Sequence, residues 1–143
     1  MRIACLHTAA SNIEIFGKAA AAMQLDAGQF NHAVHSELLE AAEKQGGITP
    51  AIETATLHII QSLMTEADAV LVTCSTLGAI ADNARTGFAK PVLRTDRALA
   101  EQALESGLSL SVLCTAPDNT GADDRIIPSG LYQCAGRTGY QAD

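Results

Sequence analysis

Short apolar runs and helical patterns alternate along this chain from residue 3 to about residue 117. The apolar runs have the length and composition of buried strands, and the segments between them carry helix start and stop signals. A repeated strand-helix order requires each strand to return to the same sheet in the same direction. The chain is therefore predicted to form an α/β fold, a parallel doubly wound sheet of flavodoxin-like type.

The expected elements follow from the local patterns. The predicted strands are residues 3–6, 31–34, 69–72, 91–93 and 108–113. The predicted helices are residues 11–23, 36–44, a helix opened by Thr49 and Pro50, and residues 76–84 and 96–104. Ser11 and Glu14 have the spacing of a capping box, and Gly46-Gly47 closes the second helix. The helix after Pro50 carries an apolar stripe of Ile52, Ala55, Ile59, Leu63 and Met64.

Length and local pattern together predict one folded lobe and a tail. A chain of 143 residues with 48% hydrophobic residues can bury one sizeable core. Residues 1–117 are expected to form the α/β lobe, and residues 118–143 an irregular or disordered tail without helical or strand periodicity. Within that tail, Ile126-Ile127 and Leu131-Tyr132 are each long enough for one short pairing strand.

Charge and composition exclude several classes of partner. The net charge of -7 and the absence of a Lys/Arg cluster argue against nucleic acid and anionic membranes. The first apolar run is too short for a membrane span or a signal segment, so we expect a cytoplasmic protein. The four cysteines show neither CxxC nor zinc spacing, which predicts free thiols and no metal. No glycine-rich phosphate loop is present, which argues against a nucleotide-binding site.

Cys74 is the residue around which chemistry is expected. In an open parallel sheet, ligands bind outside the carboxyl ends of the strands, where Cys74, Ser75 and Thr76 follow the third apolar run. A cysteine at the start of the next helix would be held as a thiolate beside N–H groups that attract a carboxylate. Such a thiolate can act as a general base on the carbon next to that carboxylate. The alternative is a buried cysteine that only packs.

Other side chains are predicted at the same edge of the sheet. His7 would orient the carboxylate or serve as a hydrogen-bonded structural histidine, and Thr8 and Asn12 would donate to the substrate. Asn12 alternatively caps its helix. Thr115 follows the fifth predicted strand and is expected at this edge too. Polar residues elsewhere are interpreted as solvated surface groups: His32, His35, His58 and Asp82.

Five segments resemble the aspartate/glutamate racemase superfamily, in order and at the expected spacing. They are residues 2–8 with Asn12, 46–50, 68–78, 91–96 and 112–117, and the most specific part is Cys74-Ser75-Thr76-Leu77-Gly78. The resemblance implies a two-lobed, cofactor-independent α/β enzyme that binds a small carboxylate or amino acid between pseudo-symmetric lobes. In typical members two cysteines on opposite sides of the substrate carbon exchange a proton, and Cys74 corresponds to one of them.

The sequence departs from this pattern after residue 117. The second pseudo-symmetric lobe is largely missing, and neither Cys114 nor Cys134 has the context of the second catalytic cysteine. A truncated or out-of-frame sequence would explain the change. The expected function is therefore Cys74-dependent proton transfer at the α-carbon of a small carboxylate, impaired by loss of the second lobe. The alternatives are a non-catalytic carboxylate-binding fragment and a one-cysteine decarboxylase or isomerase. A lobe without its partner lobe leaves apolar surface uncovered, so we expect a homodimer or larger oligomer.

Overall fold

The computed structural model describes residues 1–84, 87–105, 110–112 and 132–134. The chain divides into two compact units, Met1–Thr95 and Asp96–Asp143. The division falls well before residue 117, where the sequence pattern changes.

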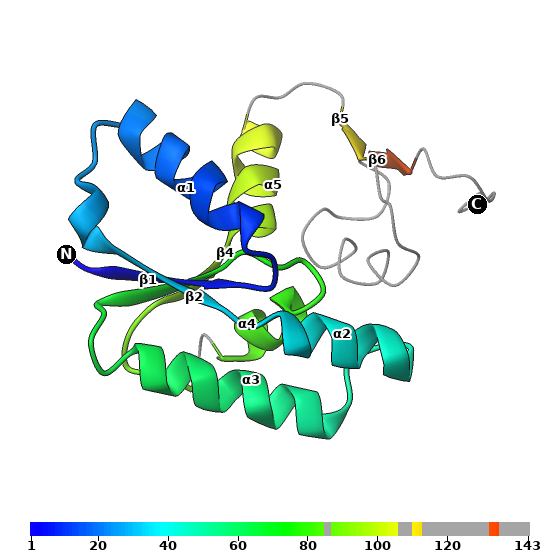
Figure 1. Cartoon of the computed structure of the whole chain (residues 1–143). Coiled ribbons are helices and arrows are strands. Elements are labelled where there is room, and N and C mark those ends of the chain that lie inside the picture. The colour runs from blue at the N-terminus through cyan, green and yellow to red at the C-terminus, as the bar shows by residue number, and fades with distance from the viewer. Residues whose placement is uncertain (85–86, 106–109, 113–131, 135–143) are drawn as a thin grey trace. The chain divides into compact units, whose positions relative to one another are not determined.

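The first unit is built on a four-stranded parallel sheet in the order β2-β1-β3-β4 (Figure 1). Its strands are β1 (Ile3–His7), β2 (Phe30–Val34), β3 (Ala69–Val72) and β4 (Val92–Arg94). β1 lies at the centre, where Leu6 pairs with Ala33 of β2 on one side and with Val72 of β3 on the other. This order is the flavodoxin order, and the predicted α/β class with a parallel sheet is confirmed.

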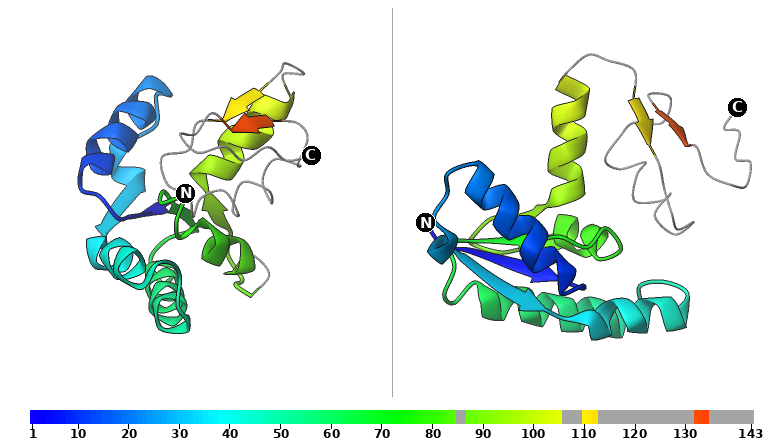
Figure 2. Two further views of the ribbon diagram at one scale, coloured as in Figure 1. Left: turned by 90° about the vertical axis from the view of Figure 1, so that its right-hand side faces the viewer. Right: turned by 45° about the horizontal axis from the view of Figure 1, so that its top comes forward.

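Helices cover both faces of this sheet. They are α1 (Ser11–Ala22), α2 (Ser36–Gln45), α3 (Pro50–Leu63) and α4 (Gly78–Ala84), with a 3-10 turn η1 (Ala27–Gln29) before β2. Figures 1 and 2 show α1 on one face of the sheet and α2 and α3 on the other. Helices on both faces leave the carboxyl ends of the strands as the open edge.

The apolar core lies between the sheet and α2, α3 and α4. Alternate strand residues point into it, among them Ala4 and Leu6 of β1 and Val70 and Val72 of β3. The predicted stripe of α3 is wrong at Ala55, which is exposed, and it omitted Thr56 and Ile60, which are fully buried. Its other members are buried or pack against the core: Ile52, Ile59, Leu63 and Met64. The buried row therefore follows every fourth residue from Ile52, and the Thr56 hydroxyl donates to the Ile52 carbonyl at 2.8 Å. That internal hydrogen bond lets a threonine occupy a core position.

The cap of one helix and the start of another differ from the sequence prediction. The capping box at Ser11 does not form, because Ala10 is the N-cap residue and no side chain caps the helix. α4 begins at Gly78 instead of residue 76, since the Gly78 N–H closes a turn onto the Ser75 carbonyl at 3.0 Å before the helix starts. By contrast, α3 starts as predicted, with the Thr49 side chain accepting from the Ile52 N–H at 3.4 Å.

The second unit contains most of α5 (Thr95–Glu105) and a two-stranded parallel sheet of β5 (Leu110–Val112) and β6 (Tyr132–Cys134). β5 forms the middle of the predicted fifth strand, and β6 lies in the segment predicted as a tail. Residues 118–131 and 135–143 of that segment, Cys114 and Thr115 lie outside the described residues. No helix in the described part of the chain is long and apolar enough to cross a membrane.

Candidate functional site at the carboxyl edge of the sheet

The first unit has a topological switch point between β1 and β3. From β1 the chain moves outward to β2 and then returns to the other side of β1 to form β3. The helices that follow β1 and β3 leave on opposite faces of the sheet, and ligands of open parallel sheets generally bind at the carboxyl ends of the strands beside such a switch point. Leu6 pairs with Val72, and the Thr73 N–H donates to the Leu6 carbonyl at 3.1 Å. Residues 7–8 consequently lie opposite residues 73–74.

His7, the last residue of β1, is fully buried and hydrogen-bonded through both ring nitrogens. Its Nδ1 lies 2.8 Å from the Thr73 hydroxyl and its Nε2 lies 2.9 Å from Nδ1 of His32. The Thr73 hydroxyl donates to the Leu6 carbonyl at 3.1 Å, so it accepts from His7. These contacts assign His7 as the Nδ1–H tautomer whose Nε2 accepts from the Nδ1–H of His32. Burial lowers the pKa of His7, and the neighbouring His32 lowers it further, which favours this neutral form.

Asn12 and Thr8 lie on the β1 side of the switch point. Asn12 lies in the first turn of α1 and donates from Nδ2 to the Thr73 hydroxyl at 3.4 Å. It therefore joins the polar group around Thr73 and does not cap its helix. Thr8 follows β1 directly and is 7% exposed. The Thr73 hydroxyl is the point at which side chains from β1 and α1 meet, a contact between distant segments that the sequence pattern does not indicate.

Cys74 lies two residues beyond β3, with Ser75 and Thr76 after it. Its thiol is free, the residue is 9% exposed, and its side chain packs within the apolar core. Because α4 begins at Gly78 and has seven residues, Cys74 does not lie at the start of a helix as the sequence suggested. Ser75 is exposed and Thr76 is half-buried. Residues 74–76 therefore carry a thiol and two hydroxyl groups at the carboxyl end of β3. No helix begins directly at the thiol.

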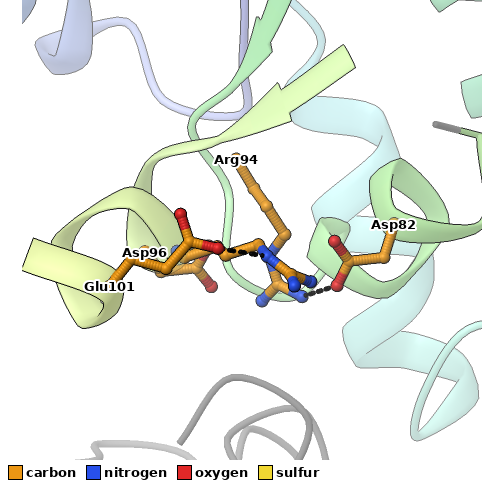
Figure 3. A network of polar contacts seen from close by, with 5 residues as sticks. Asp82, Arg94, Asp96 and Glu101 are labelled. Carbon is orange, nitrogen blue, oxygen red and sulfur yellow. Dashed lines mark hydrogen bonds and ion pairs between the residues drawn. The ribbon is translucent and has the colours of Figure 1, made fainter. Parts of the chain in front are cut away.

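A buried ion pair lies beside the start of α4, the helix that follows the Cys74 segment. Arg94 at the end of β4 has a side chain with 1% exposure and donates to the Asp82 carboxylate of α4 at 2.7 Å (Figure 3). A Cβ atom on Gly78 would lie 2.5 Å from the Arg94 guanidinium carbon, so the glycine makes room for this side chain. The interpretation of Asp82 as a solvated surface charge is therefore wrong. The alternation of β4 could have indicated it, because Arg94 shares its sheet face with the buried Val92.

His32 and Cys5 form a second group beside His7. His32 was interpreted as a surface histidine, but it is half-buried and bonded to His7. Cys5 is fully buried, and burial raises the pKa of its thiol to about 11. The register pairs Cys5 with His32, which is a contact that linear spacing does not reveal. The predictions for the other two histidines differ in outcome: His58 is exposed, whereas His35 is half-buried and its Nδ1 lies 2.6 Å from Glu37.

A scan against protein-family models, a search of curated proteins and a search of solved structures each found no match. The resemblance to the aspartate/glutamate racemase superfamily therefore rests on the sequence segments alone.

Proposed function

We propose that the carboxyl ends of β1 and β3 form a crevice that binds a small carboxylate, such as an amino acid or hydroxy acid, and that Cys74 exchanges the proton on its α-carbon. The observation that carries the proposal is the position of Cys74 after β3, across from Thr8 after β1, at the switch point of a parallel sheet. The sequence resemblance to the racemase superfamily assigns the same two segments to substrate.

The side chains around the proposed crevice have two roles, carboxylate binding and positioning of the Cys74 segment. Thr8 and Thr76 carry hydroxyls, and Ser75 carries an exposed hydroxyl, all suited to hydrogen bonds with carboxylate oxygens. Hydrogen bonds to a charged group are each worth about 1.5–3 kcal/mol, enough to hold a small anion without a cationic side chain. His7 acts as a positioning residue, because its neutral ring fixes Thr73 next to Cys74.

Cys74 would remove the α-proton as a thiolate and return it to the same face of the carbon as a thiol. Exchange of this kind needs one acid-base group, whereas inversion needs a second group on the opposite face. In the described part of the chain, Cys74 is the one thiol at the carboxyl edge of the four-stranded sheet. We therefore expect proton exchange with little racemisation, in a protein that uses no cofactor.

A second candidate is carboxylate binding without turnover. The packing of Cys74 within the apolar core favours this reading, since a buried cysteine more often packs than reacts. A one-cysteine decarboxylase or isomerase is the third, and it would use the same thiol to protonate a carbanion.

The test follows the α-proton of aspartate, glutamate and malate in deuterated water by NMR, beside a calorimetric titration of each acid. We expect binding in the full chain and in Cys74→Ala, with exchange lost only in the variant. Thr8→Val should weaken binding about tenfold, the loss of about 1.5 kcal/mol for one hydrogen bond to a charged group. Cys134→Ala, which removes a thiol in the other unit, is the matched control and should change neither property.

The outcomes separate the candidates. Binding without exchange in the unaltered chain would support the non-catalytic reading. Fast racemisation that Cys74→Ala abolishes would reveal a second acid and contradict the one-sided mechanism. Failure of every carboxylate to bind would overturn the proposal, including the role given to the crevice.

A further inference from the structure

A thiol and two imidazoles meet on the face of the sheet that α1 covers. Cys5 and His7 are two residues apart on β1, so their side chains leave the same face, opposite to Ala4 and Leu6 in the main core. His32 joins them from β2, where it pairs with Cys5. The Phe16 ring of α1 lies over His7 with ring centroids 5.5 Å apart. Sγ of Cys5 and a ring nitrogen of each histidine all lie within 4.8 Å of one another.

We propose that Cys5, His7 and His32 form a binding site for a zinc-class divalent ion, open to one further ligand. The site shares His7 with the polar group around Thr73, but it is argued from Cys5, His7 and His32 and does not depend on the proposed function. Thiolate and imidazole are the ligands that Zn²⁺ prefers in proteins, and three such ligands plus water are usual where one position stays open.

The three ligand atoms would have to move toward tetrahedral spacing, and a pair as far apart as 4.8 Å would close by about 1.2 Å. Zinc-nitrogen bonds of about 2.0–2.1 Å and a zinc-sulfur bond of about 2.3 Å put tetrahedral ligand atoms about 3.3–3.6 Å apart. His7 Nε2 and His32 Nδ1, now 2.9 Å apart, would separate by a few tenths of an ångström to admit the ion. His32 is half-buried on β2, which pairs only with β1 among the described strands.

The hydrogen bonds around His7 prepare it as a ligand. Its Nδ1–H donates to the Thr73 hydroxyl, which fixes the ring and leaves the Nε2 lone pair directed at His32. Metal-bound histidines generally have such a partner on the second nitrogen. On binding, the ion would take the place of the proton shared by the two rings. His32 would carry its proton on Nε2 instead, and the Cys5 thiol proton would be released to solvent.

The metal-free cluster is also complete in its own right, since no buried side-chain nitrogen or oxygen of the described residues lacks a hydrogen-bond partner. The fold therefore does not require the ion in order to form. Occupancy would add cross-links between β1 and β2, and it should appear as added stability of the folded chain.

The test titrates the full-length, metal-free chain with Co²⁺ and with Zn²⁺. Co²⁺ should bind with one-to-one stoichiometry and produce a thiolate-to-cobalt charge-transfer band and the visible bands of a tetrahedral ion. Zn²⁺ should displace it and, at a hundredfold excess over its dissociation constant, raise the thermal midpoint by at least about 5 °C.

Variants assign the ligands. Cys5→Ser should lose the charge-transfer band, and His32→Gln should weaken Co²⁺ binding at least about tenfold. His58→Gln, an exposed histidine on α3, is the matched control and should bind as the unaltered chain does. A chain with Cys74, Cys114 and Cys134 all changed to Ala should keep the band, because Cys5 remains. If Cys5→Ser does not fold, the His32→Gln result and this triple variant still decide.

Two results would overturn the proposal. The first is no saturable binding of either ion, which would leave a purely hydrogen-bonded cluster. The second is a charge-transfer band that survives in Cys5→Ser or disappears in the triple variant, which would place the thiolate ligand elsewhere.

Discussion

Gly78 occupies a position where the Arg94 guanidinium takes the space of a side chain. Arg94 is buried and paired with Asp82, so it cannot move aside without exposing or unpairing a charge. Gly78→Ala would put a methyl group 2.5 Å from the guanidinium carbon. We expect a loss of about 3–5 kcal/mol in the free energy of unfolding, the range for breaking a buried ion pair, measured by urea denaturation.

Gly17 is the matched control for Gly78, because both glycines are helical. A Cβ on Gly17, within α1, would meet nothing within 4 Å. Gly17→Ala should therefore stabilise the protein by about 0.5–1 kcal/mol through helix propensity alone. Equal effects of the two substitutions would contradict the steric role given to Arg94.

The cysteines of the first unit differ in their surroundings, which predicts different reactivity. Cys5 is fully buried with its thiol pKa raised to about 11, so at pH 8 only about one molecule in a thousand carries a thiolate there. Cys74 is 9% exposed at the carboxyl edge of the sheet. Limiting iodoacetamide should label Cys74 before Cys5, as measured by peptide mass mapping. Earlier labelling of Cys5 would contradict the assignment of Cys74 as the reactive thiol.

The helices α1 and α2 end with the same hydrogen-bond pattern but different residues. At the end of α1 the N–H groups of Gln24 and Leu25 donate to the carbonyls of Ala21 and Ala20, and Gln24 has a positive φ of 57°. At the end of α2 the corresponding left-handed residue is Gly46, with φ 70°. A left-handed conformation costs a residue with a side chain about 1–2 kcal/mol.

Exchanging the residue type at these two helix ends should change stability in opposite directions. Gln24→Gly should stabilise by about 0.5–1 kcal/mol, since it removes the left-handed strain at some entropic cost. Gly46→Ala should destabilise by about 1 kcal/mol, entirely through the backbone, because its Cβ would meet nothing within 4 Å. Thermal unfolding followed by circular dichroism measures both. A destabilised Gln24→Gly would show that the glutamine side chain has a role of its own.

At the scale of the whole molecule, the sequence predicts those features that depend on neighbouring residues alone. Strand-helix alternation, the Thr49-Pro50 start of α3 and Gly46 after α2 gave the correct class and most element positions. Contacts between distant segments were not predictable in this way. His32 meets His7 only through the register of β1 and β2, and Asp82 meets Arg94 only because α4 packs beside β4. The capping box at Ser11 does not form, because Ser11 is the first residue of α1 and the N-cap position falls on Ala10.

The first unit also carries apolar side chains that the described structure leaves exposed. On β4, Val92 and Arg94 face the main core, so Leu93 faces the side that α1 covers, where it is 47% exposed. β4 pairs only with β3 among the described strands, and α1 exposes Ile15 at 58%. An apolar face next to a strand edge favours association with another chain. We therefore expect at least a dimer in solution.

Sedimentation velocity over a range of concentrations tests this expectation. Leu93→Lys should shift the chain toward monomer, because a lysine on an edge strand opposes pairing and removes apolar contact. Ile48→Lys is the matched control: Ile48 is 37% exposed in the connection between α2 and α3, away from β4, and its substitution should leave association unchanged. A compact monomer at the highest concentration reached would contradict the expectation. Equal loss of association in both variants would show that general surface hydrophobicity, and not the β4 face, brings the chains together.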